Sequence, residues 1–275
     1  MKPPGVLALA LPLLGCGTPD TPGPDDVTRS GIERGSYRVP GSPLRVSFLR
    51  KGDPAGRRVI FVHGTPGSAQ GWARLLARPP AGVDLIAVDR PGFGATIPPG
   101  PVPSLADQAA ALAPLLTEQG GDWPILVGHS LGGPIIAQAA LDHPGRVGGL
   151  LILAGSFDPA LEHVYAVQRM AEWPGLRAAL PQALRNANVE LMALKPQLET
   201  LAPRLQQLRC RVAVVHGTKD AQVPYANVRF LQLRVAGARL SVRTLPGVNH
   251  FLPWNSQAIV EATIAELLAE VAGRC

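Results

Sequence analysis

The sequence predicts an α/β fold in which a parallel sheet is covered by helices on both faces. Short, nearly continuous apolar runs recur along the chain, as expected for strands buried on both sides, and segments with helical spacing separate them. The length of 275 residues, with 46% apolar and 17% charged residues, suits one large globular domain.

Strands and helices alternate from residue 44 to residue 154. The segment 44–49 alternates apolar and polar residues, as a half-buried strand does, whereas the later strand segments are nearly continuous apolar runs. We expect these buried strands at 58–62, 84–88, 123–127 and 150–154. Helices are expected at 68–77, 104–118 and 134–141, and Ser104 is a residue type that caps helices.

This alternation is interrupted between residues 157 and 208, so the core is predicted in two parts, 31–156 and 209–275. The interruption carries prolines and two helix-like pieces, 160–170 and 178–194, but no buried strand. An insertion of this length is too long for a plain loop, which predicts a helical lid. Regular structure then returns, with strands at 212–216 and 239–245 and helices at 225–235 and 257–271.

The most specific local motif is Gly128-His129-Ser130-Leu131-Gly132, between a predicted strand and a predicted helix. A serine on such a tight turn is lifted out of the fold, and small flanking residues are needed because the turn is crowded. Serine is a poor nucleophile at neutral pH, so it needs a base, and the base needs an orienting carboxylate.

Both partners follow later strands. Asp220 comes after the 212–216 strand and His250 after the 239–245 strand, which places them at the same sheet edge as Ser130. The chain order Ser, Asp, His is the order found in α/β-hydrolases.

Five segments together resemble the α/β-hydrolase family, and the resemblance runs from about residue 40 to the end of the chain. They are HGTPGS at 63–68, DRPGFG at 89–94, GHSLGG at 128–133, HGTKDAQVP at 216–224 and GVNHF at 247–251. The resemblance implies an eight-stranded, mostly parallel sheet with helices on both faces and a helical lid inserted after strand six.

The resemblance also implies roles for individual residues. Ser130 would be the nucleophile, His250 the general base and then acid, and Asp220 the group that holds His250 in the right tautomer. The backbone N–H groups of Leu131 and Thr65 would form the oxyanion hole. No cofactor is expected.

Other readings of nearby residues stay open. Asp158, after the sixth strand, is an alternative acid, because some members of the fold place the acid there. His63 and His129 lie inside tight turns, where a histidine more naturally holds a loop than acts as the base. Asp89 is expected to lock its Pro-Gly turn. Three aromatic residues are candidates for lining a substrate pocket or for packing: Phe93, Phe251 and Trp254.

The function predicted from these residues is hydrolysis of small carboxylic esters through an acyl-enzyme. Proline iminopeptidases, lactonases and carbon–carbon bond hydrolases of the same fold are alternatives, as is a surface binding protein without catalysis.

The net charge of +6 comes from scattered basic residues, so no nucleic-acid partner is expected. No metal-ligand spacing or glycine-rich phosphate loop appears in the sequence, and oligomeric state is left open.

The N-terminal segment resembles a bacterial lipoprotein signal peptide over residues 1–15. The apolar stretch 6–14 is too short to span a bilayer, and Leu13-Leu14-Gly15-Cys16 is similar to a lipobox. Cys16 would then carry the lipid, and residues 16–30, rich in Pro, Gly, Thr and Asp, would form a flexible tether. The resemblance implies a lipid-anchored protein of the bacterial cell envelope, with the periplasmic side of the outer membrane favoured by Gly17. An ordinary secretory signal and an apolar N-terminus with a chance cysteine are the alternatives.

Cys210 and Cys275 are candidates for a disulfide. Cys210 precedes a strand and so lies at the edge opposite the active site, and the last helix returns Cys275 to that same edge. Outside the cytoplasm such a pair can oxidise, whereas two free buried thiols are the alternative.

Overall fold

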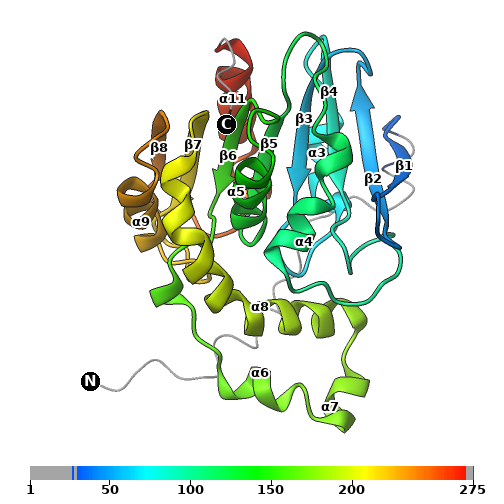
Figure 1. Ribbon diagram of the computed structural model, residues 1–275, viewed down its shortest axis with the longest axis vertical. Coiled ribbons are helices and arrows are strands. Elements are labelled where there is room, and N and C mark those ends of the chain that lie inside the picture. The colour runs from blue at the N-terminus through cyan, green and yellow to red at the C-terminus, as the bar shows by residue number, and fades with distance from the viewer. Residues whose placement is uncertain (1–26, 28–29, 271–274) are drawn as a thin grey trace.

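A computed structural model describes residues 27, 30–270 and 275 of the chain. One sheet of eight strands runs through the molecule in the order β1-β2-β4-β3-β5-β6-β7-β8 (Figure 1). Strands β3 to β8 pair in parallel, and β2 pairs antiparallel with both β1 and β4. The predicted eight-stranded, mostly parallel sheet is therefore confirmed.

The strands occupy the apolar runs of the sequence. Their bounds are β1 Glu33–Arg38, β2 Arg45–Gly52, β3 Arg57–Val62, β4 Val83–Val88, β5 Ile125–His129, β6 Gly149–Leu153, β7 Arg211–Gly217 and β8 Leu240–Leu245. Only β1 has no counterpart among the expected strands, because it is a polar edge strand whose residues are mostly exposed or half-exposed. An edge strand buries too little surface to produce an apolar run.

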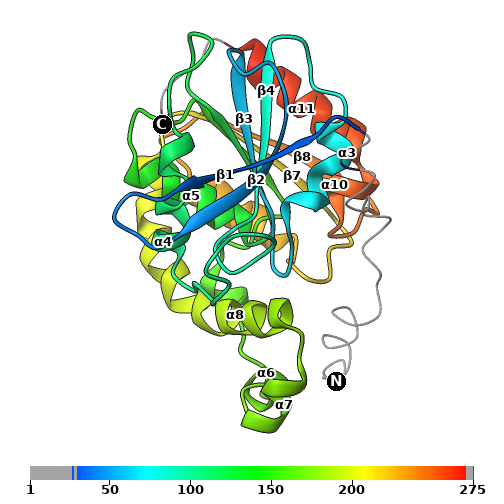
Figure 2. The ribbon, with the colours of Figure 1, turned by 90° about the vertical axis from the view of Figure 1, so that its right-hand side faces the viewer.

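Alternate residues of each central strand enter two separate cores. Ile60 and Val62 face the core that holds α4 (Leu105–Ala110) and α5 (Gly132–Asp142). Val59 and Phe61 face the opposite core. The helices on that side are α3 (Ala73–Leu76), α10 (Leu252–Asn255) and α11 (Gln257–Ala269), as Figure 2 shows. A sheet covered on both faces sends its strand ends, and not its faces, toward solvent.

Two of the helices predicted before residue 157 are shorter than expected. The 104–118 helix is instead α4 followed by the 3₁₀ turn Ala113–Leu115, because Pro114 cannot donate the backbone hydrogen bond that a continuous helix needs. Ser104 does cap α4, since its side chain accepts from Asp107 N at 3.1 Å. The 68–77 helix is a 3₁₀ turn, Ala69–Trp72, followed by α3.

The segment between β6 and β7 consists of helices and turns. It contains the 3₁₀ turn Pro159–Leu161, α6 (Ala166–Met170), α7 (Pro174–Ala179), α8 (Gln182–Leu201) and the 3₁₀ turn Ala202–Gln207. Figure 1 shows α8 across one end of the sheet, with α6 and α7 beyond it. Helix α8 continues through Pro196 to Leu201, beyond the predicted end at residue 194, because Leu194, Leu198 and Leu201 are buried in the core.

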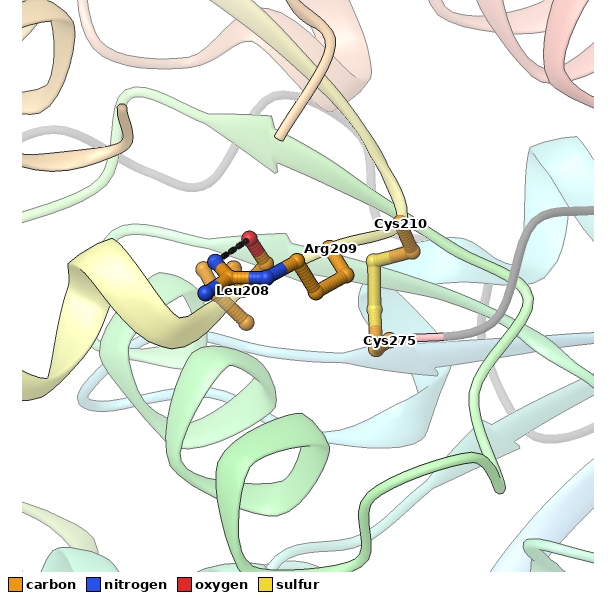
Figure 3. Close-up of a disulfide and its surroundings, with 4 residues drawn as sticks. All are labelled: Leu208, Arg209, Cys210 and Cys275. Carbon is orange, nitrogen blue, oxygen red and sulfur yellow. Dashed lines mark hydrogen bonds between the residues drawn. A yellow bond between two sulfur atoms is a disulfide. The ribbon is translucent and has the colours of Figure 1, made fainter. Parts of the chain in front are cut away.

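Helix α9 (Ala226–Arg234) connects β7 to β8. A disulfide joins Cys210 to Cys275 (Figure 3). Cys210 directly precedes β7, and the backbone N–H of Cys275 donates to Val147 O, which precedes β6. The bridge therefore lies at the amino ends of these strands. Cys16, the proposed signal segment and nearly all of the 16–30 tether lie outside the described residues. In the part of the chain that the structure describes, no helix is both long and apolar enough to cross a membrane.

Candidate active site

Ser130 occupies the sharp turn between β5 and α5. Its φ of 54° lies in the left-handed region, which is strained for a residue with a side chain. Its backbone is fixed from two sides, since Ser130 N donates to Leu153 O at 2.9 Å and Ser130 O accepts from Gly133 N at 3.0 Å. These contacts hold the turn that carries Ser130 at the carboxyl end of β5.

The two glycines of this motif are required by close backbone approach. A Cβ atom on Gly128 would lie 2.3 Å from Gly132 O, and one on Gly132 would lie 2.3 Å from Val62 O. Gly64 is equally restricted, because its Cβ would lie 2.8 Å from Ser130 Cβ. The loop after β3 therefore passes directly beside Ser130.

Asp220 and His250 form a buried pair at the same end of the sheet. His250 Nδ1 donates to Asp220 Oδ2 at 2.7 Å, and both residues are less than one-tenth exposed. The second carboxylate oxygen, Oδ1, accepts the backbone N–H groups of Gln222 at 2.9 Å and Val223 at 2.8 Å. These contacts fix the carboxylate and engage Nδ1, so Nε2 is the ring nitrogen of His250 that Asp220 does not contact.

The environment keeps Asp220 ionised. Burial alone would raise its pKa, but the hydrogen bond and charge of His250, the Val223 N–H and nearby His216 outweigh it and leave the pKa below the ordinary value. An ionised carboxylate accepts a hydrogen bond from Nδ1–H and holds the imidazole in one tautomer.

The other histidines of the region hold loops. His129 Nε2 donates to His250 O at 3.0 Å, and its ring lies 4.6 Å from that of His250. Burial, followed by the charge of His250, lowers the pKa of His129 to about 3, so it is neutral. His216 Nε2 donates to Val223 O at 2.9 Å, and burial lowers its pKa as well. Both contacts support the loops that carry Asp220 and His250.

Two further carboxylates are occupied elsewhere. Asp158 caps the turn that follows it, because its Oδ1 accepts from Ala160 N at 2.9 Å, whereas Asp220 is the carboxylate that contacts His250. Asp89 accepts the backbone N–H groups of Ala69 and Ala95 and also pairs with Arg34 at 2.7 Å. It locks its turn as the sequence predicts.

The three candidate pocket aromatics have different surroundings. The Phe251 ring lies 6.0 Å from that of His250, and the Trp254 ring lies 5.7 Å from that of His129. Phe93 is buried and lies 4.8 Å from the guanidinium of Arg90. Phe251 and Trp254 thus adjoin His250 and His129, whereas Phe93 lies against Arg90 and the ring of His63, 5.6 Å away.

A buried polar cluster beside the site was not singled out from the sequence. Arg90 and Glu190 are each 1% exposed and form a two-pronged ion pair, with distances of 2.7 and 3.1 Å. Gln108 also donates to Glu190 at 2.7 Å. The sequence signal that could have revealed this cluster is a set of polar residues on one face of α8. Asn186, Glu190 and Gln197 lie on that face and contact Gly92, Gln108 and Leu105, respectively.

Thr65 and Leu131 flank Ser130 from two loops. Leu131 directly follows Ser130 at the start of α5, and Thr65 follows Gly64 in the loop beside Ser130. Their backbone N–H groups therefore belong to the two segments that border the serine. Among the described residues, no group of three or more His, Cys, Asp or Glu side chains could hold a metal ion.

Comparison with known proteins agrees with this architecture. A family model described as the alpha/beta hydrolase fold matches residues 57–188. The chain has the α/β-hydrolase fold. A solved carboxylesterase structure from Nitrososphaera gargenis is similar, with a TM-score of 0.67, 20% identity, and coverage of 86% of this chain and 100% of that chain. A likeness at this identity concerns the fold alone.

Two curated proteins show similarity over part of the sequence. Pimeloyl-[acyl-carrier protein] methyl ester esterase of Photorhabdus laumondii is 29% identical over 144 residues, which are 52% of this chain and 49% of that protein. The dihydrolipoyllysine-residue acetyltransferase component of an acetoin cleaving system from Cupriavidus necator is 36% identical over 104 residues, or 38% and 28% respectively. The chain spans less than half the length of each of these relatives.

Proposed function

We propose that this protein is a serine hydrolase that cleaves small carboxylic esters. The observation that carries the proposal is the buried His250–Asp220 hydrogen bond of 2.7 Å at the strand ends where Ser130 occupies its strained turn. The hydrolase fold and the similarity to an ester-cleaving relative support the same class of enzyme.

In the proposed reaction Ser130 Oγ attacks the ester carbonyl carbon while His250 Nε2 takes the hydroxyl proton. Asp220 accepts Nδ1–H and stabilises the imidazolium that forms. The carbonyl oxygen becomes an oxyanion, for which the Leu131 and Thr65 N–H groups are the proposed donors, each contributing about 3 kcal/mol.

Collapse of this intermediate breaks the carbon–oxygen bond to the alcohol. His250 then gives its proton to the leaving alkoxide, which departs as the neutral alcohol and leaves an acyl group on Ser130. Water repeats the sequence, with His250 as base and Ser130 as the leaving group, and releases the carboxylic acid. Atoms and protons balance without a cofactor.

The direct test is covalent labelling with a fluorophosphonate probe. We expect rapid labelling of the wild-type protein and none of Ser130→Ala, with matching loss of p-nitrophenyl butyrate turnover. An intact wild-type protein that takes up no probe contradicts the proposal and favours a non-catalytic binding role.

A substrate panel separates the activities that share this fold. We expect short p-nitrophenyl esters to be turned over faster than lactones or proline naphthylamide. Faster cleavage of the amide indicates an iminopeptidase-like enzyme. Preference for lactones, or for vinylogous diketones, indicates a lactonase or a carbon–carbon bond hydrolase.

We further infer that the mature protein is anchored in the bacterial cell envelope through lipid on Cys16. The lipobox-like segment 13–16 supports this inference, and the Cys210–Cys275 disulfide suits an oxidising compartment. Mass spectrometry of the mature N-terminus should find an acylated chain that begins at Cys16. An unmodified chain with another first residue contradicts the anchor.

A further inference from the structure

The buried Arg90 side chain connects the segment between β6 and β7 to the loop beside Ser130. Arg90 follows β4, and its guanidinium is bound on one side by both carboxylate oxygens of Glu190 on α8. On the other side Arg90 Nη2 donates to Gly64 O at 3.0 Å. Leaving a buried guanidinium without such partners would be strongly destabilising, so these contacts fix the arrangement.

His63 supplies a second donor to the same carbonyl. Its Nε2 accepts from Arg90 N at 3.1 Å, so the ring proton lies on Nδ1, which donates to Gly64 O at 2.7 Å. Arg90 Nε lies 3.4 Å from Nδ1, a longer contact that gives way to these two shorter hydrogen bonds. Burial, followed by the adjacent Arg90 charge, holds the pKa of His63 well below its ordinary value, and the ring is neutral. Gly64 O is therefore held by two donors from one buried cluster.

This carbonyl belongs to the same peptide unit as the Thr65 N–H. A trans peptide is planar, and its C=O and N–H point in opposite directions. Donors that fix the direction of Gly64 C=O therefore also fix the direction of Thr65 N–H. Hydrogen bonds to the carbonyl also polarise the peptide, which makes its N–H a stronger donor.

We propose that Arg90 and Glu190 are positioning residues for the oxyanion hole: Glu190 holds Arg90, and Arg90 aims the Thr65 N–H through Gly64. This inference rests on the proposed ester hydrolysis. Neither side chain touches the reacting atoms. The proposal makes the rate of the chemical step depend on a carboxylate carried by α8.

The decisive variant is the double substitution Arg90→Met/Glu190→Met, in which both residues are changed in one protein. Replacing both members of a buried ion pair with apolar side chains of similar length is often neutral for stability, whereas removing one leaves an unpaired charge. His63 keeps its hydrogen bond to Gly64 O in this variant. We therefore expect a folded protein whose kcat for p-nitrophenyl butyrate falls about 10- to 100-fold, with KM changed less than threefold.

A trifluoromethyl ketone distinguishes positioning from general packing, because it forms a tetrahedral oxyanion adduct with the serine. The proposal predicts that its Ki rises by the same factor by which kcat falls. The conservative Arg90→Lys variant keeps the charge but not the two-pronged geometry, so we expect an intermediate kcat.

Asp84→Asn is the matched control. Asp84 is fully buried and pairs with Arg50 and Arg58 near the amino end of β4, whereas Arg90 follows the carboxyl end of that strand. We expect lower stability but unchanged kcat and Ki. If Arg90→Met/Glu190→Met folds and keeps wild-type kcat and Ki, the positioning role is wrong, while ester hydrolysis stands. A wild-type protein without turnover or probe labelling overturns both.

Discussion

His250 donates from Nδ1 to Asp220 Oδ2 over 2.7 Å, although the two residues lie 30 positions apart in the chain. The turn after β7 presents the carboxylate and the turn after β8 presents the ring. Two adjacent parallel strands thus deliver the acid and the base to one point, and their register fixes the contact between them.

Asp220→Asn should lower kcat by about 10³- to 10⁴-fold, because an amide does not hold the imidazole in the tautomer that accepts the serine proton. Asp158→Asn is the matched control, since Asp158 caps a local turn, and we expect it to keep near-normal kcat. The measurement is p-nitrophenyl butyrate turnover by both variants. The reverse pattern of losses would assign the acid to Asp158.

Gly132→Ala should destabilise the protein and abolish probe labelling. The added Cβ would lie 2.3 Å from Val62 O, so either β3 or the serine turn must shift. Gly175→Ala is the control, because its Cβ meets nothing within 4 Å and it lies in α7. We expect the control to be neutral or stabilising by up to about 1 kcal/mol. Urea unfolding compares the two, and equal stabilities would contradict the crowding at the turn.

The free energy of unfolding should decrease steadily as the pH falls below about 6.5. Buried His63, His129 and His216 have pKa values below 6.5, and that of His129 is about 3. On acidification the unfolded chain therefore binds protons that the folded protein does not, at up to about 1.4 kcal/mol per pH unit for each histidine.

Asp220 acts in the same direction. Its pKa is lowered in the fold, so its contribution is present at neutral pH and is lost as the pH falls through the folded pKa. Urea titrations at several pH values measure the combined slope. His129→Gln cannot titrate, and we expect a shallower slope from it. An identical slope in this variant would contradict the assignment of His129 as a neutral buried group.

Reduction of the Cys210–Cys275 disulfide should lower stability by about 4 kcal/mol, since the bridge closes a loop with a sequence separation of 65. Activity should persist at temperatures where the reduced protein stays folded, because the bridge lies at the amino ends of β6 and β7. Cys275→Ser should match the reduced wild-type protein in thermal unfolding and should not respond to reductant. A wild-type unfolding curve unaffected by reductant would argue for free thiols.

The positions of the buried strands and the candidate site residues were accessible from the sequence for a simple reason. Strands buried on both faces produce continuous apolar runs, and the residues after those runs must meet at one edge. Ser130, Asp220 and His250 each follow such a run. Asp89 was also assigned to its turn correctly, since three donors hold its carboxylate.

Other features depended on tertiary contacts that no local pattern encodes. Arg90 and Glu190 are 100 positions apart, so their pairing follows only from how α8 packs. Pro196 failed to end α8 because core burial outweighed its local cost, whereas Pro114 did end the regular helix. The local backbone cost of proline therefore determined the helix end near Pro114, whereas packing determined that the helix continues at Pro196.

Helix α8 belongs to two parts of the molecule at once. Asn186 and Glu190 reach the loops around the candidate site, whereas Leu194, Leu198 and Leu201 complete the core behind α5. If the segment between β6 and β7 were exchanged between related proteins and the cut were made at the turn before β7, these core leucines would be exchanged as well. The modular boundary for redesigning specificity therefore lies inside a helix, ahead of Leu194.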